Sequence, residues 1–205
     1  MKGRSSTYIR PRAAVQCRLA ALLLATTLQM SCTALPERGP RELLDERTGA
    51  TLITAAEPLV FARSRTDVAA NARDYATLVG VEADRSGQYA AYLLVYRWST
   101  VDRRVAPLPE PVMGALIAQA DGRELNLKPL NPTPAALQGR RDLHAPPTSQ
   151  WVSWAYGVDL PTLLYIAESS ALALRFPDEP VPVPFSLWRD GRKALQEFAA
   201  RGVRR

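Results

Sequence analysis

Side chains that commonly carry out catalysis are sparse in this chain. Its 205 residues include one histidine and two cysteines. A catalytic triad needs a base within hydrogen-bond reach of a nucleophile and an orienting acid. The histidine, His144, lies in a proline-rich stretch, and the sequence contains neither a Gly-x-Ser-x-Gly nor a Ser-x-x-Lys motif. We therefore expect no catalytic residues of this kind and interpret His144 as a solvated or loop-ordering side chain.

Metal and nucleotide sites also lack their usual residues. Structural zinc requires several histidine or cysteine ligands at close spacing, and the sequence has no glycine-rich phosphate loop. Glu82 with Asp84, and Asp121 with Glu124, supply too few oxygens for a calcium loop. The sequence therefore predicts no metal and no cofactor. A hydrolase that uses only two carboxylates remains open, because paired acids cannot be located before the fold is known.

The N-terminal residues have the layout of an export signal. Five basic residues and no acid stand before an apolar stretch at residues 19–28 (LAALLLATTL). That stretch is too short to span a bilayer as a helix. We predict a signal peptide over residues 1–31 and a lipid on Cys32, as in bacterial lipoproteins. Residues 32–47 are then a polar tether between this anchor and the domain.

The residues around Cys32 leave one alternative. Gln29 occupies the place, three residues before the cysteine, where lipoprotein signals usually have leucine. Cleavage after Ala34 would instead leave a soluble periplasmic protein. In the Gram-negative lipoproteins that this signal resembles, an aspartate directly after the cysteine retains the protein in the inner membrane. Here Thr33 occupies that position. We therefore expect an exported protein on the periplasmic side of the outer membrane.

The charge of the chain does not indicate a nucleic-acid partner. The formal net charge is +6, from 26 basic and 20 acidic residues. Without the five basic residues of the signal, 21 basic residues face 20 acids, and the net charge falls to +1. Such a balance lacks the basic excess of nucleic-acid-binding domains. The expected partners are the membrane, through the lipid on Cys32, and another envelope protein.

Alternating apolar residues and turn signals predict mainly strands. Residues 75–83 and 88–99 flank Asp84-Arg85-Ser86-Gly87, which suits a type I turn. The second of these strands is apolar on both faces, so we expect it to be central and covered on both sides. Residues 112–120 and 123–128 form a second predicted hairpin around Asp121-Gly122.

The remaining elements are shorter. Pro182 and Pro184 cannot donate to a ladder, so the strand at 181–187 is expected at an edge. Asp159 is a predicted helix N-cap, and Gly202 a predicted helix stop. Residues 129–150 are rich in proline and predict a long surface loop with one helical turn. The other expected elements are strands at 51–54, 58–62, 151–158 and 171–176, and helices at 159–168 and 187–200.

These elements predict a β-rich α+β fold in a single domain over residues 48–205. The arrangement we expect is an antiparallel β-sandwich or half-barrel. It has about seven or eight short strands and a C-terminal helix packed on or beside them.

Three polar or aromatic positions attract attention within this fold. Arg97 lies in the most apolar strand, so its charge needs a partner, and Asp74 at the base of the same hairpin is the expected structural ion pair. Trp151 and Trp154 have opposite parity on one strand, so at most one belongs to a one-sided core. We predict that the other, with His144 and the 129–150 loop, forms a partner-binding face. The alternative is that the loop packs over the sheet to cover an aromatic ring.

Three stretches resemble a group of known sequences: 73–82 (RDYATLVGVE), 96–104 (YRWSTVDRR) and 185–198 (FSLWRDGRKALQEF). They are similar to uncharacterised small exported proteins of Gram-negative bacteria, many with lipoprotein signals. The resemblance covers most of residues 45–200 and implies a compartment and a β-rich fold, but no activity.

Together these observations favour a non-catalytic, lipid-anchored envelope module that binds or scaffolds another component. The missing nucleophile, base and metal sets make an enzyme the less favoured class. The alternatives are a carboxylate-based hydrolase acting on envelope or exported substrates, and a carrier with an aromatic cavity for a small ligand.

Overall fold

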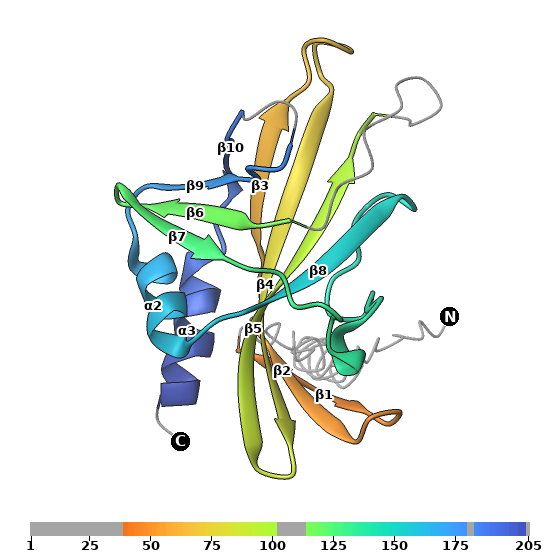
Figure 1. The fold of residues 1–205 in the computed structure, drawn as a ribbon, viewed down its shortest axis with the longest axis vertical. Coiled ribbons are helices and arrows are strands. Elements are labelled where there is room, and N and C mark those ends of the chain that lie inside the picture. The colour runs from red at the N-terminus through yellow and green to blue at the C-terminus, as the bar shows by residue number, and fades with distance from the viewer. Residues whose placement is uncertain (1–38, 102–113, 180–182, 204–205) are drawn as a thin grey trace, which may run out of the picture. The chain divides into compact units, whose positions relative to one another are not determined.

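Residues 39–101, 114–179 and 183–203, which the computed structural model describes, fold around one open and mostly antiparallel sheet of ten strands (Figure 1). The predicted β-rich α+β class with a C-terminal helix is confirmed, and the strands are more numerous than expected. The elements are β1 (Arg41–Asp45), β2 (Ala50–Thr54), β3 (Leu59–Ser64), β4 (Arg73–Arg85), β5 (Gln88–Ser99), β6 (Leu116–Ala120), β7 (Arg123–Leu127), the 3-10 turn η1 (Ala135–Leu137), β8 (Trp151–Gly157), α2 (Leu160–Glu168), β9 (Leu172–Arg175), β10 (Phe185–Arg189) and α3 (Arg192–Val203).

A long ribbon of β4 and β5 organises the sheet. The first half of β4 pairs with β3 and its second half with β2, while β5 pairs with β8 along its other edge. Ser86 and Gly87 join the two strands with positive φ angles of 56° and 82°. This is the pattern of a type I′ turn, whose twist matches that of the strands, rather than the predicted type I turn.

The rest of the sheet continues from β3 through β10, β9, β6 and β7. Strand β3 runs along the ribbon, whereas β6, β7 and β9 are oriented across its direction, and α2 and α3 lie side by side (Figure 1). The chain then returns to β8, where the Leu130 N–H donates to the Ala155 carbonyl at 2.8 Å. Asp121 and Gly122 form the predicted two-residue turn between β6 and β7, with φ angles of 47° and 82°.

Strand β5 separates two apolar cores. Leu93 and Val95 face the larger core, which α2, α3 and strands β6, β9 and β10 complete. Leu94 and Tyr96 face the second core, against η1 and the 129–150 loop. Because successive residues of a strand point to opposite faces, this confirms that β5 is central and covered on both sides.

Both helices begin at a residue suited to a helix start. Asp159 caps α2, as predicted, by accepting the Thr162 N–H at 2.8 Å. A β-carbon at Gly191 would lie 2.4 Å from the Pro58 carbonyl oxygen, so only glycine fits before α3. Neither helix in the described ranges is long and apolar enough to cross a membrane.

Three sequence predictions need correction. Residues 41–45, which were expected in the tether, form β1 and pair with β2. Strand β10 starts after Pro184 and pairs on both sides, with β3 and β9, so it is internal rather than at an edge. Helix α3 starts at Arg192 instead of residue 187, and Gly202 lies within it.

Candidate functional site

Trp151 and Trp154 point to opposite faces of β8, as their spacing predicted. Trp154 lies opposite Val95 in the larger core and is 8% exposed. Trp151 lies opposite Trp98 on the other face and is only partly buried. Trp154 is therefore a core residue, and only Trp151 can contribute to a surface.

Four rings form what we call the aromatic row: Tyr75 of β4, Trp98 of β5 and Trp151 of β8, which are on neighbouring strands, and Trp188 of β10, which is separated from β4 by β3. Tyr75 pairs with Trp98, which in turn pairs with Trp151. The rings of Tyr75 and Trp98 stack with centroids 3.9 Å apart and planes 6° apart. Trp188 meets Tyr75 edge-on at 6.4 Å and 82°, and it is 58% exposed. The row therefore runs from a covered end at Trp151 to an open end at Trp188.

A register shift in β10 shapes the open end. Leu187 pairs with Phe61 and Arg189 pairs with Val60, which leaves Trp188 as the extra residue between them. Such a bulge places two consecutive residues opposite one on the partner strand and re-aims their side chains. Trp188 and Arg189 are both exposed as a result.

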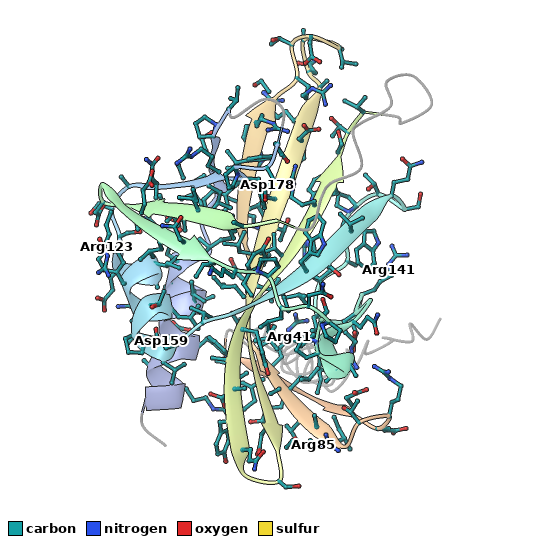
Figure 2. The ribbon with its side chains drawn as sticks, in the orientation of Figure 1. Arg41, Arg85, Arg123, Arg141, Asp159 and Asp178 are labelled. Carbon is teal, nitrogen blue, oxygen red and sulfur yellow. The ribbon has the colours of Figure 1, made fainter. Side chains whose placement is uncertain are left out.

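Arginines accompany the row at both ends. The Arg73 guanidinium carbon lies 4.8 Å from the centroid of the Trp188 ring, and that of Arg141 lies 5.9 Å from Trp151. Figure 2 shows Arg141 beside β8. Within the residues that the structure describes, neither these two arginines nor Arg189 forms an ion pair. Within the described part of the chain, no carboxylate pairs with their positive charges.

The 129–150 loop is fastened over the second core. Leu137 and Leu143 are buried beneath it. The Tyr96 hydroxyl donates to the Arg140 carbonyl at 2.6 Å, and Arg140 binds Asp45 at 2.9 Å. Arg41 of β1 donates to the Leu143 carbonyl at 3.2 Å. The loop thus covers aromatic and aliphatic side chains, which is the packing alternative, and it also ends beside Trp151.

His144 lies in this loop against Tyr96. The two ring centroids are 5.2 Å apart, at an interplanar angle of 63°. Its Nε2 is buried and has no hydrogen-bond partner among the described residues. Burial lowers the pKa of His144, and the charges of Arg41 and Arg189 lower it further. The neutral imidazole is therefore the form that the folded protein favours.

This environment predicts that acid destabilises the fold before the carboxylates titrate. The folded-state pKa of His144 lies below its unfolded value of about 6.5, so the unfolded chain binds the proton more readily. The stability that the neutral His144 contributes to the fold is present above its unfolded-state pKa and is lost as the pH falls below that value. We expect the free energy of unfolding, measured with urea between about pH 7.5 and pH 5.5, to decrease with falling pH. His144→Asn should flatten this slope, since the chain has no other histidine, and an equally steep slope would contradict the prediction.

Arg97 has a different partner from the one predicted. Its Nη2 lies 2.5 Å from Oε1 of Glu179, which also binds Arg63. Asp74 pairs instead with Arg63 at 3.0 Å and Arg65 at 3.4 Å. Sequence reasoning placed Asp74 near Arg97 but could not detect Glu179, because 82 positions separate Arg97 from it. The resulting network fixes the 176–179 segment to β3 and β5.

Aromatic rings complete the surroundings of Arg97. Its guanidinium carbon lies 4.2 Å from the Phe176 centroid and 4.9 Å from that of Phe185. Burial lowers the pKa of Arg97, and Glu179 opposes that shift. Its Nε is buried with no hydrogen-bond partner in the described part of the chain. We therefore regard the network as structural, with Glu179 rather than Asp74 as the ion-pair partner of Arg97.

Two further observations on the described residues concern metal ions and small ligands. No group of three or more His, Cys, Asp or Glu side chains in residues 39–101, 114–179 and 183–203 could hold a metal ion. One depression of about 310 Å³ lies between the β6–β7 turn and β9, lined by Gln119, Gly122 and Ala171–Ala173. Its lining offers one amide and no ionisable side chain, so it supplies no acid or base.

Cys32 and the predicted signal at 1–31 lie outside the described residues. Trp188 was not singled out from the sequence, because the apolar spacing there suggested the C-terminal helix. The strand predicted at 181–187 ends one residue before Trp188, whereas β10 continues to Arg189. No family model matches the sequence, and no curated protein or solved structure matches it either.

Proposed function

We propose that this protein is a non-catalytic, lipid-anchored module of the cell envelope that binds another envelope protein through the aromatic row. The observation that carries the proposal is the exposed Trp188 at the end of four neighbouring rings. Interface hot spots are enriched in tryptophan, tyrosine and arginine, and the row with its arginines has this composition. The partly buried Trp151 and the nearby His144 form the covered end of the same face.

A lipid on Cys32 would hold β1 close to the membrane. Arg41 lies nine positions after Cys32, and an extended chain advances at most about 3.6 Å per residue. A lipid on Cys32 would therefore hold the start of β1 within roughly 30 Å of the membrane surface. In this proposal, the signal at 1–31 directs export and the outer membrane holds the anchor on its periplasmic side.

The anchor can be tested by replacing one residue. We expect Cys32→Ala to abolish fatty-acid labelling and to release the protein from the membrane fraction. Each buried CH₂ of an acyl chain contributes about 0.8 kcal/mol to membrane binding, so loss of the chains removes the anchor. The measurement is metabolic labelling with fractionation of cells expressing the full chain. Unchanged labelling and membrane retention in the variant would exclude lipidation at Cys32.

The binding role can be tested by cross-linking in cells. A photoreactive phenylalanine analogue at position 188 is expected to capture another envelope protein when the full chain is expressed. The same analogue at Tyr89, an exposed aromatic residue of the β4–β5 hairpin, is the matched control and should give no such adduct. Equal adducts at both positions, or none at position 188, would contradict binding through the aromatic row.

A further inference from the structure

We infer that the aromatic row docks an acidic segment of a protein partner. This inference rests on the proposed binding function and specifies the chemistry of the partner. Three features of the described residues carry it: uncompensated arginines at both ends of the row, the orientation of the rings, and the exposed apolar area of Trp188.

Half of the fourteen arginines in the described residues form no ion pair there, and the three arginines of the row are among them. Seven arginines elsewhere in the described chain meet a carboxylate within 4 Å, namely Arg63, Arg65, Arg97, Arg140, Arg175, Arg192 and Arg201. Arg73, Arg141 and Arg189 form no ion pair within that part of the chain, yet they lie on one face. The protein as a whole, without its signal, is almost neutral. A local positive charge on a near-neutral molecule selects partners that present acidic groups.

The ring orientation favours a protein over a glycan or a nucleic acid. Tyr75 and Trp98 stack on each other across neighbouring strands, so each covers one face of the other. The stacking axis runs along the sheet, and strand side chains stand roughly perpendicular to the sheet. The ring edges therefore point away from the sheet. Bases bind aromatic side chains by stacking on open ring faces, and sugars use the same faces.

Ring edges have an electrostatic preference of their own. The edge of an aromatic ring carries partial positive charge, whereas its face is negative. Tyr75 is buried and Trp98 is partly buried, so the exposed ring edge that adds to the field of Arg73 and Arg189 and attracts carboxylates is that of Trp188. The face of Trp188 is engaged by Arg73 at 4.8 Å, and its remaining exposed area offers an apolar contact. A segment that combines Asp or Glu with an apolar residue matches both properties.

A peptide selection tests this inference without knowledge of the natural partner. The probe is a displayed library of random dodecapeptides, selected on the protein purified from cells that express the full chain. We expect the bound peptides to be enriched in Asp and Glu around an apolar residue. Their affinity should fall at least tenfold with Trp188→Ala and at least fivefold with Arg73→Gln or Arg189→Gln. It should also weaken as the salt concentration rises.

The matched control is Arg123→Gln. Arg123 also lies over an aromatic ring, with its guanidinium carbon 5.3 Å from the Tyr165 centroid. It begins β7, and Figure 2 places it on the opposite side of the view from Arg141. This variant should bind the selected peptides as the natural protein does. Unchanged melting temperatures for all four variants would show that lost binding reflects the surface and not the fold.

Several results would overturn the inference. One is a set of bound peptides without acidic enrichment, and another is acidic peptides that bind equally well to Trp188→Ala. Alginate, an acidic polysaccharide, serves as the second probe. If it bound in a Trp188-dependent way while no peptide did, the partner would be a glycan instead.

The experiments distinguish a wrong inference about the acidic segment from a wrong proposed function. Cross-linking at position 188 and labelling at Cys32 report whether the protein is anchored and binds an envelope protein at all. The selection reports only the chemistry of the segment that binds. A cross-linked partner combined with charge-independent peptides would leave the proposed function intact and overturn this inference alone.

Discussion

Replacing Glu179 with alanine is expected to lower the free energy of unfolding by about 3–5 kcal/mol. The Glu179 carboxylate binds both Arg97 and Arg63, and Arg97 is largely buried beside Phe176 and Phe185. Removing the carboxylate leaves the Arg97 guanidinium charged in an apolar place, where its desolvation is no longer offset. Urea denaturation of the natural protein and the variant measures the difference.

Two controls separate the buried charge from a general effect of the substitution. Glu124→Ala removes a pair with Arg175 in which both side chains are well exposed, and it should cost less than about 1 kcal/mol. Adding Arg97→Met to Glu179→Ala should restore most of the lost stability, since an apolar side chain tolerates the same surroundings. A loss in Glu179→Ala as small as that in Glu124→Ala would show that the Arg97 network contributes little.

Leu94→Asp is expected to prevent folding. Leu94 is fully buried on β5, between Val79 of β4 and Ala155 of β8. A carboxylate there would lose its hydration without a partner, at a cost comparable to the whole stability of a domain. Leu94→Ala removes the same packing without the charge and should cost about 2–5 kcal/mol. Circular dichroism and thermal melting measure both outcomes.

An exposed leucine provides the matched control for this substitution. Leu44 of β1 is 65% exposed, so an aspartate at that position keeps its water. Leu44→Asp should therefore change the melting temperature by no more than a few degrees. A Leu94→Asp protein that melts like Leu44→Asp would mean that the second core does not support the sheet.

Local sequence patterns were enough to predict several elements. The unbroken apolar run of Leu93, Leu94 and Val95 identified β5 as a covered central strand, because a strand apolar on both faces must be buried on both. Asp121-Gly122 identified its hairpin, and Asp159 identified the start of α2. Each of these signals depends on residues within a few positions of one another. Their physical causes, backbone sterics and local hydrogen bonds, are already present in the isolated segment.

Other predictions failed where local patterns were ambiguous. The apolar spacing from residue 187 suggested one long helix, but Leu187 and Trp188 pair within the sheet and α3 begins after Gly191. The close approach of Gly191 to the Pro58 carbonyl decides that boundary, and no pattern of apolar residues reports such an approach. Residues 41–45 became a strand because β2 offers them an edge.

By itself the sequence determined the β-rich class, the main hairpins, the burial of β5 and the scarcity of histidine and cysteine, since these follow from composition and short-range spacing. Only the tertiary structure decided that Glu179 binds Arg97, that Trp154 is in the core, and that Trp188 joins Tyr75, Trp98 and Trp151. Those contacts join strands that are distant along the chain. Which strands become neighbours depends on the free energy of the whole sheet and its two cores, and no single segment contains that information.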